Sequence, residues 1–190
     1  MPILNKPIEK GDILLSLPTA SFEELEFSRS VVLIADQHSE GTVGFIINKA
    51  LDITLNQLMP NITTSLTIYN GGPVENDKLF CIHSCPDLVM NSHHIYNDLY
   101  WGGDFDQILT LLNQGILNKD NTKFFLGYTG WDYGQLNIEL SKHFWLKSES
   151  KINTQDFYTK HSKMFWKNNL KEFGSQYSIW QNAPENPNNN

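Results

Sequence analysis

The first clear pattern in this chain is a series of short apolar runs rich in β-branched residues, which predicts strands over 13–15, 30–35 and 42–47. The last two runs are separated by a polar segment, 36–41, that ends in Gly41, and glycine tolerates a positive φ. We therefore expect a hairpin here. Because both of its strands are almost wholly apolar, it should be buried on both faces.

Further apolar runs predict strands over 66–69, 79–83 and 123–126. The sequence Gly-Gly-Pro at 71–73 lies between the first two of these runs. Proline fixes its own φ and biases the preceding residue toward extended geometry, so a tight turn is expected between the two strands.

Helices are predicted where capping signals precede an apolar stripe. Thr54, Asp104 and Asp132 are each followed three residues later by Gln, the pattern of a capping box, so three helices should begin there. In the third of them Gln135 would close the box, and one face would carry Tyr133, Leu136, Leu140 and Phe144. A fourth helix is predicted over 154–170, with Gly174 as its stop.

Strands arranged in hairpins and helices inserted singly, with no repeated strand-helix unit, favour the α+β class. We expect a mixed or antiparallel sheet that curls toward a barrel and is flanked by helices. The 190 residues suit one domain, taken as 1–180, followed by an irregular Asn/Pro-rich tail over 181–190.

Composition and charge narrow the classes of protein. The chain has 40% hydrophobic residues and lacks an apolar run of about 18 residues, so neither disorder nor a membrane span is expected. The first ten residues lack a signal-peptide pattern, which predicts a cytoplasmic protein. The net charge is -7, and the only lysine group, at 160, 163, 167 and 171, has the spacing of a solvated helix face. Direct nucleic-acid binding is therefore disfavoured.

Candidate chemistry is sparse. Cys81, His83 and Cys85 alternate along a predicted strand, and such ligands would lie about 6 to 7 Å apart, too far for a shared tetrahedral metal ion. Gly102 and Gly103 precede a helix and could present N–H groups to an anion, but Asp104 already supplies negative charge there. No nucleophile elbow or phosphate-binding fingerprint is present, so no catalytic residue, metal or cofactor is predicted.

The most unusual segment is 126–136, where three glycines, two tyrosines and a tryptophan stand between an apolar strand and a predicted helix. Ordering so many glycines is costly, so we expect a loop that lines a binding cleft. This cleft would suit a small polar or anionic ligand. In the alternative interpretation the glycines fix tight turns and Trp131 fills the core. The candidate cleft residues are Arg29, Asn48, Gly71, Gly72, Pro73, His83, Tyr128, Gly130, Trp131 and Gln135.

Taken together, several segments resemble the YqgE/AlgH family, and the resemblance covers nearly the whole chain. The segments are 27–32, 41–49, 71–74, 80–83, 100–104 and 127–136. The resemblance implies a compact bacterial α+β domain with a strongly curved sheet, a family linked by some descriptions to transcriptional regulation but without an established reaction. The chain departs from the family pattern in three places: the segment 24–26; Ala50, where the family usually has proline; and Asn137, where it has an acidic residue. An amide does not titrate near neutrality, so a general base at position 137 cannot be carried over.

Two functions remain open. The favoured one is a non-enzymatic regulatory or adaptor protein that acts through a small ligand or a protein partner. The other is a small-molecule hydrolase or transferase with His83 or His38 as its base. A base within about 3.2 Å of a hydroxyl or thiol in a pocket would favour the enzyme, whereas an exposed apolar patch without such a pair would favour the adaptor.

Overall fold

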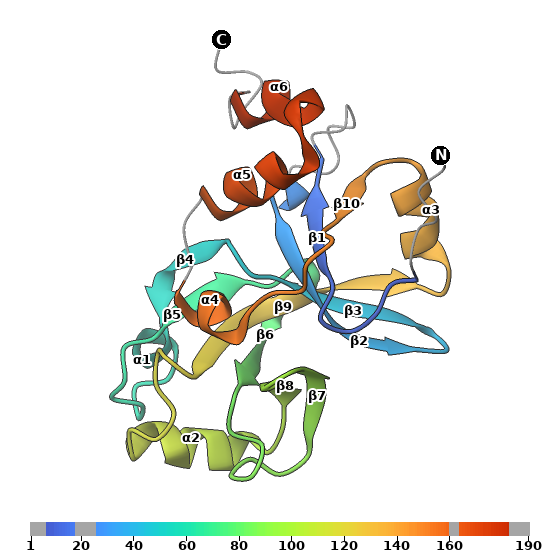
Figure 1. Ribbon diagram of the computed structural model, residues 1–190. Coiled ribbons are helices and arrows are strands. Elements are labelled where there is room, and N and C mark those ends of the chain that lie inside the picture. Colours follow the sequence, from blue (N-terminus) through green and yellow to red (C-terminus); the bar gives the residue numbers. More distant parts are fainter. Residues whose placement is uncertain (1–6, 18–25, 160–163, 183–190) are drawn as a thin grey trace.

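The computed structural model describes residues 7–17, 26–159 and 164–182. Its strands form one ten-stranded sheet, and the main path through the sheet runs β10-β1-β2-β3-β9-β6-β8-β7 (Figure 1). Outside this path, β5 pairs with β9 and β4 pairs with β5. The β5–β9 pairing is parallel, and all the others, including β4–β5, are antiparallel. The strands are β1 (Ile13–Ser16), β2 (Val31–His38), β3 (Gly41–Ile46), β4 (Ala50–Thr54), β5 (Thr67–Asn70), β6 (Val74–His83), β7 (Ser92–Tyr96), β8 (Leu99–Gly102), β9 (Thr122–Asp132) and β10 (Trp145–Lys147).

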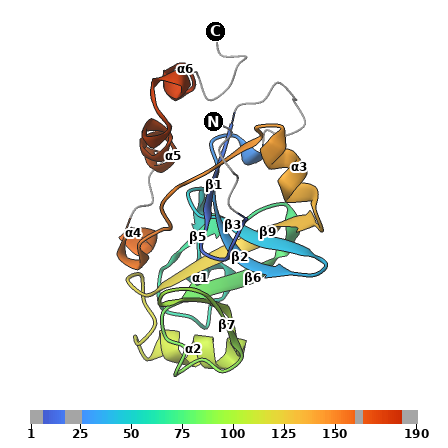
Figure 2. The ribbon, with the colours of Figure 1, turned by 45° about the vertical axis from the view of Figure 1, so that its right-hand side comes forward.

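Short helices flank the sheet at different places. In Figure 2, α2 lies at one end of the sheet, α3 at the end of β9, and α4 to α6 follow one another along one side. The helical elements are α1 (Leu55–Leu58), α2 (Phe105–Asn113), α3 (Gln135–Ser141), α4 (Thr154–Thr159), α5 (Met164–Leu170), η2 (Lys171–Phe173), η3 (Ser175–Tyr177) and α6 (Ser178–Asn182).

The mixed α+β class predicted from the sequence is confirmed, but the curl toward a barrel is not. The path through the sheet has separate ends at β10 and β7, so the sheet is open. The hairpin over 30–47 is present as β2 and β3, and its connection is tighter than the predicted 36–41 segment, because the strands pair as far as His38 and Gly41.

Two of the predicted helix starts, at Thr54 and Asp104, are confirmed. The capping box of Thr54 and Gln57 is present, and the Asp104 side chain accepts a hydrogen bond of 3.1 Å from the Gln107 N–H. The helix predicted over 154–170 is instead two helices, α4 and α5, and residues 160–163 lie outside the described part. The tail was predicted irregular from 181, but α6 extends to Asn182, while 183–190 are not described.

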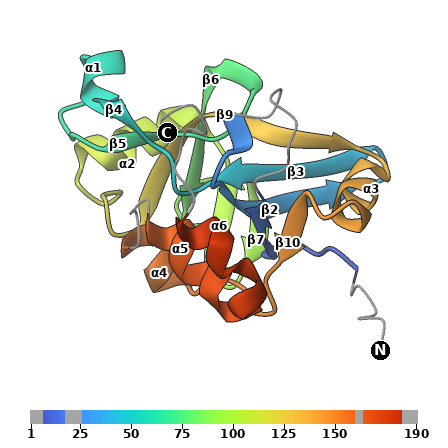
Figure 3. The same cartoon turned by 90° about the horizontal axis from the view of Figure 1, so that it is seen from above.

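Apolar side chains on the two faces of the sheet form separate clusters. On one face, Leu33, Phe45 and Phe125 pack with Phe157 of α4 and Trp166 of α5, so the C-terminal helices cover this face (Figure 3). The opposite face carries one cluster around α2 and another around α3. The central strands β2, β3 and β9 each contribute buried side chains to both faces, so burial on both sides holds them in place.

The connection from β5 to β6 crosses the longest strand, β9. Asn70 of β5 pairs with Leu126 on one side of β9, and Val74 of β6 pairs with Tyr128 on the other. The two flanking strands are about 10 Å apart, so residues 71–73 must pass directly over the β9 backbone. A Cβ atom on Gly71 would lie 2.2 Å from the Gly127 carbonyl oxygen, and one on Gly127 would lie 2.3 Å from the Gly72 carbonyl oxygen.

This crossing corrects the prediction for 126–136. Residues as far as Asp132 continue strand β9 and do not form a loop, and Gly127 has a φ of +69° where the crossing segment passes. The glycines are needed because two backbones approach more closely than any side chain allows.

We expect Gly71→Ala to lower the free energy of unfolding by more than about 3 kcal/mol, because its methyl group would collide with backbone on β9. Gly134→Ala is the matched control: its φ is +78° but nothing lies within 4 Å of the added carbon, so only about 1–2 kcal/mol of backbone strain is expected. Urea unfolding measures both variants. An equal or smaller loss at Gly71 would show that the backbones can separate without cost.

Candidate functional site

The residues predicted to share one cleft lie at separate places. His83 pairs with Thr122 at the start of β9, whereas Trp131 stands nine positions further along the same strand. At about 3.3 Å per residue the two positions are about 30 Å apart. His83 and Trp131 therefore cannot contact the same small ligand.

Arg29 and Asn48 lie where β2 begins and β3 has ended. The buried Asn48 amide donates to the Arg29 carbonyl oxygen at 2.9 Å and accepts from the Val31 N–H at 2.8 Å. The Arg29 guanidinium carbon is 5.5 Å from the centroid of the Trp166 ring. Arg29 and Asn48 thus connect the ends of β2 and β3 with α5. Because the Arg29 guanidinium lies at Trp166, it does not provide the cation that an anionic ligand near Trp131 would need.

The Gly-Gly-Pro segment, Tyr128 and Gly130 do come together, but through the backbone crossing. A Cβ on Gly72 would lie 2.4 Å from the Tyr128 carbonyl group, and the Tyr128 ring packs edge-on against Phe80 at 5.5 Å between centroids. Pro73 is exposed. For these residues the structure agrees with the interpretation in which glycines fix the backbone.

Trp131 and Gln135 belong to a clamp that holds α3 on the sheet. The Trp131 ring is buried, and its indole N–H donates to Glu139 Oε2 at 2.8 Å; the Trp145 indole donates to the same oxygen at 2.7 Å. Gln135 donates to Glu139 Oε1 at 2.8 Å and accepts from the Asp132 N–H at 2.9 Å. We did not predict Glu139, although its position four residues after Gln135 places both on one helix face.

His83 is fully buried in a hydrogen-bond chain that leaves it no basic role. Its Nδ1 accepts from the Cys85 N–H at 3.2 Å, so Nε2 carries the proton toward the Ser92 hydroxyl oxygen at 3.1 Å. That hydroxyl in turn donates to the Val89 carbonyl oxygen at 2.7 Å. Burial lowers the pKa of His83, opposed by hydrogen bonding to the Gly102 backbone. The short distance between base and hydroxyl therefore does not make Ser92 a nucleophile.

A hollow of about 230 Å³ lies beside the end of the β2–β3 hairpin and the turn from β9 into α3. His38, Gly41 and Asp132 are paired across three neighbouring strands, so their side-chain positions point to the same face. Gly41 has no side chain, because a Cβ there would lie 2.3 Å from the Trp131 carbonyl oxygen, and this leaves space between His38 and Asp132. The hollow is lined by Ile8, Gln37, His38, Gly41, Thr42, Asp132, Tyr133, Gly134, Leu136 and Asn137.

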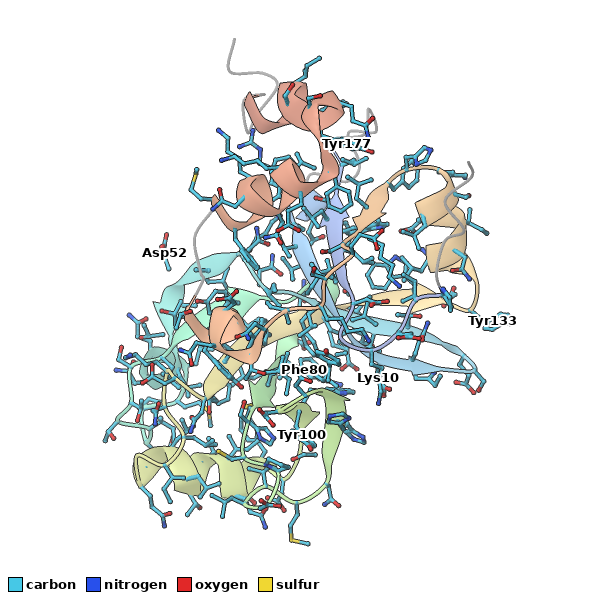
Figure 4. All side chains as sticks on the ribbon, viewed as in Figure 1. Lys10, Asp52, Phe80, Tyr100, Tyr133 and Tyr177 are labelled. Carbon is cyan, nitrogen blue, oxygen red and sulfur yellow. The ribbon has the colours of Figure 1, made fainter. Side chains whose placement is uncertain are left out.

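Two apolar side chains stand in solvent at this hollow and next to it. Tyr133 is 81% exposed and projects away from the molecule in Figure 4, and Ile138 of α3 is 56% exposed. Tyr133 was predicted on the buried face of a helix that begins at Asp132. The helix instead starts after Gly134, whose φ of +78° turns the chain, and Tyr133 is left outside it.

The charge of this hollow differs from our expectation. Among its lining residues Asp132 is the carboxylate and His38 the imidazole, and Arg29 lies elsewhere in the fold. Asn137 is among the lining residues, so an uncharged amide stands at this site. A neutral polar or cationic group fits such a lining better than an anion does.

Lys123 on β9 is the most perturbed cation of the described residues. It is 4% exposed, and its ammonium nitrogen has no hydrogen-bond partner within the described part of the chain. This nitrogen lies 4.6 Å from the centroid of the Tyr69 ring and 4.8 Å from that of Phe157 in α4. Desolvation by burial lowers the pKa of Lys123 to about 7.

Across residues 7–17, 26–159 and 164–182, no group of three or more His, Cys, Asp or Glu side chains is placed to hold a metal ion. None of the described helices has the length and apolar composition needed to cross a membrane.

Removal of the Glu139 carboxylate should release the clamp on α3. We expect Glu139→Ala to lower the free energy of unfolding by about 2–4 kcal/mol, because two indole N–H groups lose their acceptor. The exposed Glu149 provides the control, and Glu149→Ala should change stability by less than about 0.5 kcal/mol. Denaturant unfolding followed by tryptophan fluorescence compares the two. Equal effects would exclude the clamp.

Lys123→Met is expected to stabilise the protein by about 2–4 kcal/mol at about pH 8. The amine has its ordinary pKa of 10.5 in the unfolded chain and about 7 in the folded one. As the pH falls from 10.5 to about 7, the unfolded chain takes up the proton first, so the free energy of unfolding of the wild type falls. Below about pH 7 both states are protonated, and the loss of stability is complete. Urea unfolding between pH 7 and 10.5 should show a steeper pH dependence for the wild type than for Lys123→Met. Parallel curves would contradict the lowered pKa.

Comparison with known proteins places the chain in a family. The family model described as AlgH-like, DUF179, matches residues 13–178. A UPF0301 protein of Cytophaga hutchinsonii is 38% identical over 95% of this chain and 98% of its own length, and one of Bacteroides thetaiotaomicron is 37% identical over 94% and 89%.

Solved structures agree in fold. The solution structure of AlgH from Pseudomonas aeruginosa superposes with a TM-score of 0.69 at 24% identity, covering 94% of this chain and 96% of that one. A crystal structure of a Corynebacterium diphtheriae protein gives a TM-score of 0.70 at 18% identity, covering 94% of both chains. The chain belongs to the AlgH-like family, which includes the UPF0301 proteins.

Proposed function

We propose that this protein is a non-enzymatic regulatory adaptor that binds a protein partner at the hollow beside Tyr133. The observation that carries the proposal is the pair of exposed apolar side chains, Tyr133 and Ile138, at and beside a small polar hollow. Exposed apolar groups bordering a polar concavity are typical of protein-binding surfaces, and tyrosine is a frequent anchor in them.

The size of the hollow supports a partner side chain over a free metabolite. Small-molecule sites usually enclose about 300–1,000 Å³, and this hollow has about 230 Å³. Asp132 is the acidic group in its lining, and Thr42, Gln37 and Asn137 add neutral polar groups. A lysine or arginine side chain of the partner would suit this space, with Tyr133 and Ile138 packing against the surrounding apolar surface.

The enzymatic alternative is less favoured. His83 is fully enclosed and uses both ring nitrogens in structural hydrogen bonds, so it is not a base for Ser92. His38 lines the hollow beside Asn137, which cannot act as the acid or base of a pair near neutrality. Direct DNA binding also has little support, because the net charge is -7.

Site-specific photocrosslinking tests the partner surface. A benzophenone amino acid placed at position 133 should give a discrete protein adduct in the native host, whereas the same group at Leu58 should not. Leu58 is the matched control, because it is 42% exposed and lies in α1, far from α3 in Figure 1.

A second variant links the adduct to the hollow. Asn137→Trp should fill the space and lower the yield of the adduct from position 133 at least about tenfold, the effect of about 1.4 kcal/mol in affinity. Equal adducts from positions 133 and 58, or a yield unchanged by Asn137→Trp, would rule out a partner at this surface.

A further inference from the structure

A second and larger concavity lies on the other side of α3. It has a volume of about 790 Å³. The N-terminal turn (residues 7–12) and α3 line one side, the 3-10 helices η2 and η3 line the other, and β10 lies between them. Tyr177 of η3, labelled in Figure 4, lies near the upper end of β10. We call this concavity the β10 groove. All of the residues from Trp145 to Glu149 line it, so an edge of the sheet borders the groove.

The pairing of β10 shows which backbone groups are available. The Leu17 N–H donates to the Phe144 carbonyl, and the Ser148 N–H donates to the Ile13 carbonyl. In an antiparallel ladder bonded pairs alternate with non-bonded ones, so Leu146 also faces β1. The backbone N–H and C=O groups of Trp145 and Lys147 point away from β1, toward the side where the described sheet has no further strand.

The usual protection of an edge strand is weak here. A lysine on an edge often blocks pairing by projecting its charge, but the Lys147 ammonium is bound 2.7 Å from Asp12 Oδ2 and 2.8 Å from the Pro7 carbonyl oxygen. It is therefore held at the N-terminal turn. The edge is also bordered by apolar side chains that a second strand could cover, namely Leu140, Leu146, Phe173 and Tyr177.

The charges of the groove indicate the character of its occupant. Lys147 and Lys151 are already engaged, Lys147 with Asp12 and Lys151 with Glu9 at 3.2 Å. Glu149 and Glu172 are exposed in the same lining and take part in none of the ion pairs found among the described residues. The groove therefore has an excess of negative charge next to apolar surface.

We propose that the β10 groove binds an extended segment of a partner protein that carries alternating apolar and basic residues and adds to β10 as a further strand. Its backbone pairs with Trp145 and Lys147, its apolar side chains cover Leu146, Phe173 and Tyr177, and its basic side chains face Glu149 and Glu172. This surface is distinct from the hollow beside Tyr133, and the inference does not depend on that site.

Fluorescence anisotropy with a defined probe tests the proposal. The probe is a fluorescein-labelled octapeptide of alternating valine and lysine, and its counterpart has glutamate in place of lysine. We expect the lysine peptide to bind at least about tenfold more tightly than the glutamate peptide. The same lysine peptide with every backbone N–H methylated keeps its charge but has no amide to donate to β10, so its binding should also fall by about tenfold or more. Equal binding of the methylated peptide would overturn strand addition.

Amide hydrogen exchange measured by NMR locates the bound peptide. The amides of Trp145 and Lys147 should exchange at least about tenfold more slowly in the complex, whereas the Leu146 amide, already paired with β1, should change little. Unchanged exchange at Trp145 and Lys147 in the presence of bound peptide would place the peptide elsewhere and refute the proposal.

Paired charge variants separate the groove from general attraction to an acidic protein. Glu149→Gln with Glu172→Gln should weaken binding of the lysine peptide by about fivefold, while Glu40→Gln at the β2–β3 turn should have little effect. Equal losses would indicate non-specific attraction and contradict the site. Tyr133→Ser should leave peptide binding unchanged, which distinguishes this inference from the proposed function.

Discussion

The contact on which this fold depends is the crossing of two backbones at Gly127. The connection from β5 to β6 passes over β9 with no room for a side chain on Gly71 or Gly127. Because of this crossing, β9 can pair with β3 and β5 along one edge and with β6 along the other. β9 therefore runs from Thr122, paired with the buried His83, to Asp132 at the end of the β2–β3 hairpin, where the candidate site lies.

At that end, a single carboxylate organises the surface. Glu139 accepts from the indoles of Trp131 and Trp145, and so joins β9, α3 and β10 through two buried rings. α3 then separates two concavities: Leu136 and Asn137 line the hollow beside Tyr133, while Leu140 lines the β10 groove. Both proposed binding surfaces rely on the same clamp. The tryptophan that first suggested a ligand site supports the surface from beneath it.

Local signals in the sequence were good guides to local structure. The Thr54 and Asp104 caps, the β2–β3 hairpin and the apolar strand beginning at 123 can all be read from neighbouring residues, because hydrogen bonds and φ preferences act over a few positions. β7 and β8 escaped notice because their histidines and aromatic residues are adjacent in the sequence and give no alternation of apolar and polar positions. Asp132 and Gln135 suggested a capping box, yet Gly134 is the N-cap and leaves Tyr133 in solvent.

By itself, the sequence determined the α+β class, the main strands and helices, the acidic charge and the presence of an unusual glycine-aromatic segment. Only the tertiary structure decided what that segment does. A glycine required by a close backbone approach looks the same in sequence as one in a binding loop, since the approaching chain comes from a distant segment. The same holds for His83, whose role depends on Ser92 and Cys85, and for Lys123, whose lowered pKa follows from burial beneath α4.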